Sequence, residues 1–181
     1  MRIIRGTLKS QRFNPPKGFP SRPTTDFAKE GLFNMLENQF SLINLDILDL
    51  CAGTGNISLE FASREAGNII AVDQNFKCTK FIYDLVKKHD LNEMIRVYKS
   101  EAVKYLKKTP DTFDIIFTDP PFAAQIHDDI HSLVFERELL NENGILIIEH
   151  GRECNFEDKE HFQFMRKYGN VNFSFFSLTE L

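Results

Sequence analysis

Short apolar runs alternate with amphipathic segments from about residue 46 onward. Runs rich in Ile, Leu and Val fit strands at 46–50, 68–72, 94–98, 113–118 and 144–149. Between them, apolar positions recur with helical spacing at 56–65, 75–89, 101–108 and 126–139. This alternation predicts βαβ units around a parallel sheet. The unbroken apolar run at 145–148 is typical of a strand that is buried on both faces.

The C-terminal segment breaks this alternation. Two strand-like runs at 161–168 and 171–178 are separated by Gly169-Asn170, a turn-forming pair that predicts a β-hairpin. A doubly wound sheet that ends in an antiparallel hairpin is the architecture of class I methyltransferases. Dinucleotide dehydrogenases instead keep a wholly parallel sheet. The predicted fold class is therefore an α/β, Rossmann-like methyltransferase sheet.

The N-terminal segment has a different pattern. Apolar and basic residues alternate over 1–22, which predicts a small hairpin or an extended arm. A helix is expected at about 26–38, with Thr25 or Asp26 as its N-cap. Its expected buried stripe consists of Phe27, Ala28, Leu32, Met35 and Leu36. We expect residues 1–40, the arm and first helix, to belong to the same domain as the Rossmann-like unit at 41–181.

Composition supports one soluble domain. The 181 residues are 42% hydrophobic, no run approaches the roughly 20 apolar residues of a membrane span, and the start lacks an apolar signal region. Three scattered cysteines give no disulfide or zinc pattern. His127 and His131 could meet on a helix, but a solvated helix face is favoured over a metal site. A cytoplasmic monomer without metal or membrane attachment is expected.

Charge is divided unevenly along the chain. The net charge is −4, yet residues 1–30 carry seven basic and two acidic groups. The other 151 residues carry 15 basic and 24 acidic groups. A local basic arm can contact phosphates while an acidic body keeps the protein soluble. A solvated terminus without a partner would show the same charges.

A glycine-rich turn follows the first predicted strand of the sheet. Ala52, Gly53 and Gly55 would let the backbone approach a ligand at the start of the next helix. Asp49 lies inside the end of the strand, where an unpaired charge is costly. The carboxylate would be satisfied by an amine-bearing ligand. The alternative is a structural turn without a ligand.

Acidic residues also follow the next two strands. Asp73, beside Gln74, lies about 20 positions after the turn, where a carboxylate can hold a ribose diol. Ser100-Glu101 lies where an adenine amine can be held, although these residues would serve equally as a helix cap. The spacing indicates a nucleoside cofactor and is shared by NAD enzymes and methyltransferases.

The identity of the cofactor depends on the turn itself. A pyrophosphate site prefers G-x-G-x-x-G, but the third glycine position is Ser58 and the strand carries Asp49. An anionic cofactor is disfavoured beside that carboxylate, whereas zwitterionic S-adenosylmethionine is compatible with it. S-adenosyl-L-methionine is therefore the predicted cofactor.

A rigid corner ends the fourth predicted strand. Asp119-Pro120-Pro121-Phe122 cannot continue a central strand because proline lacks the N–H of the ladder. The corner leaves a carboxylate, a proline carbonyl and an aromatic ring together. These groups suit an exocyclic amine on a flat base, and Asp119 also lies near the predicted cofactor site. Together with the turn, the corner predicts an amino-methyltransferase.

Several segments resemble the RsmD family of bacterial 16S rRNA guanine-N2 methyltransferases. The likeness includes Arg2-Ile3-Ile4-x-Gly6, Arg22-Pro23-Thr24-Thr25-Asp26, Glu30-x-Leu32-Phe33-Asn34, the glycine turn and the Asp-Pro-Pro-Phe corner. The N-terminal signature is its specific part, because the last two motifs occur in many amino-methyltransferases. Family members often carry arginines in the first helix where this chain has Phe27 and Lys29, and alanine where it has Gly31.

The resemblance implies methylation of a guanine N2 in 16S rRNA on an assembling small ribosomal subunit. Asp119 and Pro120 would hold the amine, and Phe122 would stack on the base beside Pro121. Expected RNA contacts are Arg5, Arg12, Lys17, Arg22, Thr24 and Lys29. Two alternatives are an adenine-N6 methyltransferase acting on DNA or RNA, and a module that binds cofactor and RNA without catalysis. A glutamine methyltransferase is disfavoured by the basic arm.

Overall fold

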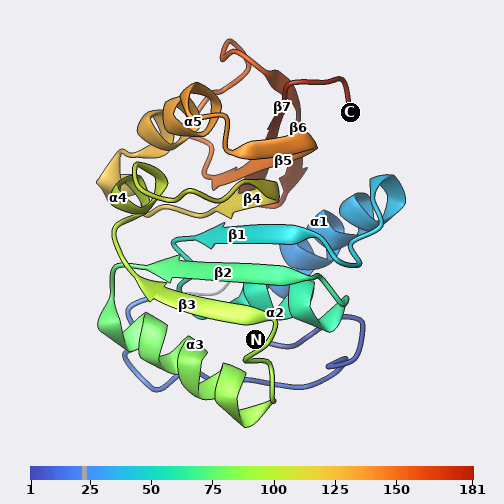
Figure 1. The fold of residues 1–181 in the computed structure, drawn as a ribbon, viewed down its shortest axis with the longest axis vertical. Coiled ribbons are helices and arrows are strands. Elements are labelled where there is room, and N and C mark those ends of the chain that lie inside the picture. Colours follow the sequence, from blue (N-terminus) through green and yellow to red (C-terminus); the bar gives the residue numbers. More distant parts are fainter. Residues whose placement is uncertain (22–23) are drawn as a thin grey trace.

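A seven-stranded sheet forms the centre of the molecule. The computed structural model describes residues 1–21 and 24–181. The strand order is β3-β2-β1-β4-β5-β7-β6, with β1 to β5 parallel and β7 antiparallel to both β5 and β6 (Figure 1). The strands are β1 Asp46–Leu50, β2 Asn68–Asp73, β3 Ile95–Lys99, β4 Phe113–Thr118, β5 Leu140–His150, β6 Phe162–Tyr168 and β7 Val171–Ser177. The expected parallel sheet with a terminal hairpin is confirmed.

Helices connect the strands and cover both faces of the sheet. They are α1 Asp26–Gln39, α2 Asn56–Ser63, α3 Phe76–Lys88, α4 Ala102–Leu106, the 3-10 turn η1 Phe122–Ala124, and α5 His127–Glu136. Across the described ranges, no helix has the length and apolar character needed to cross a bilayer.

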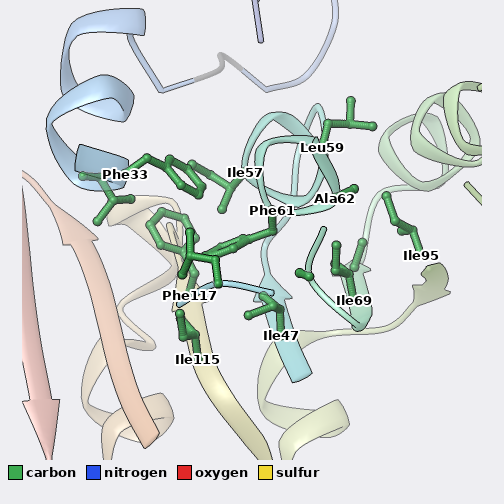
Figure 2. Packing of buried hydrophobic residues seen from close by; sticks show 14 of the residues in the cluster. Phe33, Ile47, Ile57, Leu59, Phe61, Ala62, Ile69, Ile95, Ile115 and Phe117 are labelled. Atoms are coloured by element: carbon green, nitrogen blue, oxygen red, sulfur yellow. The ribbon is translucent and has the colours of Figure 1, made fainter. Parts of the chain in front are cut away.

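Two hydrophobic cores lie on opposite faces of the sheet. Alternate residues of the strands enter them: Ile47, Ile115 and Ile147 enter the first, whereas Leu48, Ile116 and Ile148 enter the second. The first core contains side chains of α1, α2 and α3, and in it Phe33 meets Phe61 edge to face at 4.8 Å (Figure 2). Side chains of α4 and α5 enter the second core. The parallel strands are thereby buried on both faces over most of their length, except for the edge strand β3, where Arg96, Tyr98 and Lys99 are exposed.

The ends of several elements differ from the sequence prediction. The expected strand at 144–149 extends over Leu140–His150, and α5 ends at Glu136 rather than 139. Glu138 has φ 52°, a left-handed conformation that ends the helix before the long strand begins. The expected burial of Phe27 is wrong: it is 68% exposed, and its ring forms a T-shaped pair with that of Tyr168. Thr25 is the N-cap of α1, accepting the N–H of Ala28.

The N-terminal arm is docked on α2. A β-bridge joins Arg2 to Arg12, and the adjacent side chains of Ile3 and Phe13 are buried in the first core. Gly6 has φ 88°, and a Cβ there would lie 1.7 Å from the carbonyl oxygen of Ser63. Only glycine fits at this close approach, so Gly6 of the Arg2-Ile3-Ile4-x-Gly6 signature is needed for the arm to pack on α2.

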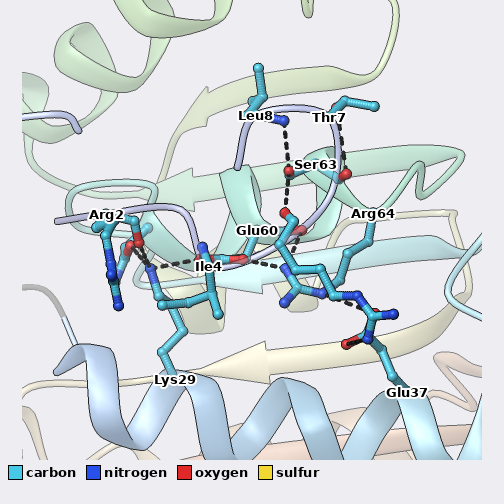
Figure 3. A network of polar contacts seen from close by, with 11 residues as sticks. Arg2, Ile4, Thr7, Leu8, Lys29, Glu37, Glu60, Ser63 and Arg64 are labelled. Atoms are coloured by element: carbon cyan, nitrogen blue, oxygen red, sulfur yellow. Dashed lines mark hydrogen bonds and ion pairs between the residues drawn. The ribbon is translucent and has the colours of Figure 1, made fainter. Parts of the chain in front are cut away.

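A buried charge network joins the arm, α1 and α2 (Figure 3). Lys29 is fully buried, and its Nζ lies 2.8 Å from Glu60 Oε1. The same ammonium donates to the carbonyl of Arg2 at 2.6 Å and to Asn56 Oδ1 at 2.7 Å. The other Glu60 oxygen pairs with Arg64, which also approaches Glu37. Each buried charge in the network lies beside an opposite charge, as burial requires, although Arg64 Nε has no hydrogen-bond partner among the described residues.

Candidate functional site

Three cavities meet at Asp119, just beyond the carboxyl end of β4. Asp119 lines a large cavity of about 660 Å³, a second of about 220 Å³, and a narrow one beside the glycine turn. The carboxyl ends of parallel strands share one edge of a sheet, which is the usual ligand-binding edge of this architecture. The sheet therefore gathers residues that are far apart in sequence.

The large cavity has walls from three successive strand ends. Its lining includes Asp73 and Gln74 after β2, Ser100 and Glu101 after β3, and Asp119 after β4. Its volume falls within the range for small-molecule sites, roughly 300–1,000 Å³. The five residues expected to surround a nucleoside are thus brought together in one cavity.

Asp73 holds the glycine turn in place. Its Oδ2 accepts the N–H of Gly53 at 2.8 Å, and its Oδ1 accepts that of Asn75 at 2.7 Å. Gly53 has φ 54°, and a Cβ there would lie 2.4 Å from Ser21 Oγ. Because each carboxylate oxygen has further acceptor capacity, Asp73 can support the turn and still accept a ligand hydroxyl.

Asp49 is a buried carboxyl at the base of the narrow cavity. Both of its hydrogen bonds from described residues reach Oδ2, from Ser58 N at 3.0 Å and Ser58 Oγ at 2.5 Å. Burial raises the pKa of Asp49 to about 7. Ala52 and Gly53 line the same cavity, and Gly55, with φ 71°, is the N-cap of α2. Ser58 stands at the third glycine position of the G-x-G-x-x-G pattern, and its hydroxyl donates to Asp49.

The Asp-Pro-Pro-Phe corner faces the 220 Å³ cavity. Asp119, Pro120 and Pro121 line it together with Glu149 and His150 of the neighbouring strand β5. Burial raises the pKa of Asp119 to about 6. The stacking expected of Phe122 concerns a side chain outside the described part of the structure.

Glu149 is a site residue that the sequence reasoning missed. It is the last residue but one of β5, and its side chain accepts a 2.8 Å hydrogen bond from Thr24 Oγ1, 125 residues earlier. Burial is the main reason why the pKa of Glu149 is raised to about 8, and the negative charge of Asp119 is the next. An acidic residue at the end of an otherwise apolar strand was the available signal, the same signal that identified Asp49.

The expected RNA contacts fall into three groups. Arg5, Arg12 and Lys17 are exposed, and Arg5 approaches Glu37 at 3.4 Å. Arg22 lies outside the described residues. The hydroxyl of Thr24 points to Glu149 rather than to solvent. The expectation for Lys29 is wrong, because its ammonium is fully buried among Glu60, Asn56 and the Arg2 carbonyl.

The two histidines of α5 also differ from expectation. His127 and His131 are 8% and 7% exposed, so the expected solvated face is wrong. His127 lines the 220 Å³ cavity, while His131 Nε2 lies 2.9 Å from the carbonyl of Glu160. Burial lowers the pKa of both rings. The pair therefore packs within the second core rather than on a surface.

Comparisons with curated proteins identify relatives along most of the chain. "Putative rRNA methyltransferase YlbH" of Bacillus subtilis is 35% identical over 161 residues, covering 87% of this chain and 86% of the relative. "Ribosomal RNA small subunit methyltransferase D" of Escherichia coli is 28% identical, covering 82% of this chain and 74% of the relative.

Solved structures show the same fold. "Putative methyltransferase yhhF" from Escherichia coli superposes with a TM-score of 0.85 at 23% identity, covering 100% of this chain and 99% of that one. A T. thermophilus 16S rRNA N2 methyltransferase, solved with AdoMet and guanosine, has a TM-score of 0.68 at 19% identity. The match covers 88% of this chain and 44% of that structure. The architecture is thus that of class I methyltransferases.

A family match covers nearly the whole chain. The family described as "Conserved hypothetical protein 95" matches residues 1–177, which include the docked arm, the glycine turn, the corner after β4 and the terminal hairpin. The chain therefore belongs to the Conserved hypothetical protein 95 family, together with its rRNA methyltransferase relatives.

Proposed function

We propose that this protein transfers a methyl group from S-adenosylmethionine to the exocyclic N2 of a guanine in 16S rRNA during small-subunit assembly. The observation that carries the proposal is the position of Asp119 at the junction of the 660 Å³ and 220 Å³ cavities. The carboxyl of Asp119 can thereby border both the methyl donor and the amine that receives the methyl group. The names of the relatives support rRNA as the substrate, and the structure containing AdoMet and guanosine supports the two ligand classes.

The residues of the large and narrow cavities fit this cofactor. Asp73 has acceptor capacity for a ribose diol, and Ser100-Glu101 border the far end of the same cavity. Asp49 is a buried carboxyl whose Oδ1 is left for an ammonium, since both hydrogen bonds from described residues reach Oδ2. A bound S-adenosylmethionine would supply an electrophilic sulfonium methyl.

The amine of guanine is a weak nucleophile because its lone pair is delocalised into the ring. In the proposed mechanism, Asp119 and the Pro120 carbonyl accept its two N–H groups and direct the lone pair towards the large cavity. Positioning of this kind supplies most of the acceleration. The new bond from the amine to the methyl carbon would replace the carbon–sulfur bond of the sulfonium, whose electron pair would leave on the neutral thioether. The amine gains positive charge in this step, which the Asp119 carboxylate stabilises before accepting the leaving proton.

Replacement of Asp119 tests this function. At saturating cofactor, Asp119→Asn should reduce methyl transfer at least about 100-fold, because a neutral amide cannot take up the proton and stabilises the developing positive charge less than a carboxylate does. Mass-spectrometric mapping of 16S rRNA from cells with and without the protein identifies the modified base. Asp158→Asn, an exposed change, is the matched control.

Three results would contradict the proposal. Unchanged transfer by Asp119→Asn would remove Asp119 from the reaction. A methylated adenine would indicate an N6 enzyme, and an unchanged methylation map would indicate a binding module.

A further inference from the structure

Glu149 is a buried carboxyl for which the methyl-transfer chemistry has no use. It is 7% exposed, lies at the end of β5, and lines the 220 Å³ cavity together with Asp119, Pro120 and Pro121. Thr24 satisfies only one of its oxygens, through the 2.8 Å hydrogen bond to Oε2. A second buried acid beside Asp119 is costly unless it has a ligand to bind.

The position of Glu149 is fixed from two sides. Its backbone pairs with Phe173 of β7 in the sheet. On the other side, the Thr24 carbonyl accepts from Asn56 Nδ2 at 3.2 Å, and Asn56 Oδ1 accepts from Lys29 Nζ. The buried network of Figure 3 therefore reaches Thr24 and, through it, Glu149. A carboxyl held on a rigid element in this way is suited to selecting a ligand.

The charged groups around Glu149 favour its neutral form. Burial contributes most to its raised pKa, Asp119 after β4 and Asp49 in β1 raise the pKa further, and the Thr24 hydroxyl lowers it. His127 of α5, and His150 and Glu153 at the end of β5, line the same cavity. Burial lowers the pKa of both histidines, so neither supplies a strong counter-charge near pH 7. A neutral carboxyl has one O–H donor and one carbonyl acceptor.

The edge of guanine beside its amine offers the complementary pair. N1–H is a donor and O6 an acceptor, whereas adenine has a bare N1 acceptor beside its amine. We propose that Glu149 is a specificity-determining residue that selects guanine by accepting its N1–H and donating to its O6. The inference rests on the proposed function, because it places the amine between Asp119 and Pro120. The same proposal makes the 220 Å³ cavity the pocket that holds the guanine base.

An RNA that carries 2-aminopurine at the mapped guanine tests this assignment. That base keeps the exocyclic N2 amine but lacks both N1–H and O6. The wild-type protein should prefer guanine in kcat/KM by about 10- to 100-fold, the effect of leaving a buried polar group unpaired. Glu149→Ala should lower kcat/KM for guanine by a similar factor and leave 2-aminopurine nearly unchanged. The ratio between the two bases should therefore fall towards one.

Two further variants separate recognition from structural support. Glu149→Gln keeps one acceptor and one donor, so it should retain the preference for guanine. Thr24→Val removes the hydroxyl that orients Glu149 and should reduce the preference partially, even if Glu149→Ala does not fold. Cofactor affinity and the thermal midpoint report any general damage.

The results distinguish the inference from the proposed function. If the wild-type protein methylates guanine but the Glu149 and Thr24 variants slow both bases equally, Glu149 is structural and the inference is wrong. If the wild-type protein methylates no guanine, the proposed function fails and the base-reading role fails with it.

Discussion

At the residue scale, four carboxyl groups follow or end four strands at one edge of the sheet. They are Asp49, Asp73, Asp119 and Glu149, from β1, β2, β4 and β5. Asp73 is satisfied by backbone N–H groups, whereas burial raises the pKa values of the other three. Buried acids of this kind become favourable when a cation or hydrogen-bond donor occupies the site.

The ionisation of Asp49 should control cofactor affinity. Its pKa is raised to about 7, and an ammonium ligand binds the ionised form better, so binding should strengthen between pH 6 and 8 with release of a proton. Asp49→Asn should bind S-adenosylmethionine about 10-fold more weakly at pH 8 and show a flatter pH profile. Calorimetric titration in two buffers of different ionisation enthalpy measures both effects.

Asp119 and Glu149 also titrate near this range, so Asp119→Asn and Glu149→Gln in the same experiment separate their contributions. A wild-type pH slope in Asp49→Asn would contradict the role given to Asp49.

At the element scale, the arm, α1 and α2 depend on one buried ion network. Lys29 and Glu60 are fully buried, and Arg64 is 4% exposed in its side chain. Removing one partner leaves an uncompensated charge, which costs more than the pair contributes. The arm is tied to the same groups, since Ile4 N–H donates to Glu60 Oε1 at 2.7 Å.

Lys29→Ala should therefore lower the free energy of unfolding by about 3–5 kcal/mol and loosen residues 1–13. Lys80→Ala is the matched control, because it breaks the exposed pair with Asp84 and should cost about 0.5 kcal/mol or less. Denaturant titration measures the difference, and amide hydrogen exchange locates it. Equal losses in the two variants would contradict the structural role of Lys29.

Hydrophobic periodicity predicted the helices and strands, but contacts between residues far apart in the sequence determine where several side chains lie. The strands and the hairpin around Gly169-Asn170 follow from local pattern alone. The burial of Lys29 depends on Glu60, and the placement of Glu149 depends on Thr24, partners 31 and 125 residues away. Asp49 and Asp119 were predictable because both follow or end strands with strong local signals. A single sequence gives no comparable signal for which polar groups meet.

At the scale of the whole molecule, the N-terminal part has a net positive charge and the rest of the chain has a net negative charge. Arg5, Arg12 and Lys17 are exposed although the arm is docked through its apolar residues and backbone. The docked arm can therefore present cations at fixed positions. Ordered cations bind phosphates without the entropy cost of ordering a free terminus.

Replacing Arg5, Arg12 and Lys17 together by Ala should weaken RNA binding and flatten its salt dependence. Each lost phosphate contact lowers the slope of log K against log salt by about 0.7 to 0.9. A variant with Lys87, Lys88 and Lys107 replaced by Ala changes the charge equally at the ends of α3 and α4. Fluorescence anisotropy at several salt concentrations measures the slopes. Similar slopes for both triple variants would contradict a specific role for the arm.

The close contact of Gly6 with Ser63 also constrains the order in which segments of the chain fold. Thr7 N–H bonds to the carbonyl of Ser63, 56 residues later in the chain, so the arm can complete its contacts only after α2 has been synthesised. Until α2 forms, Ile3 and Phe13 have no complete core to enter. Residues 1–13 can therefore dock only on a βα unit that has already formed.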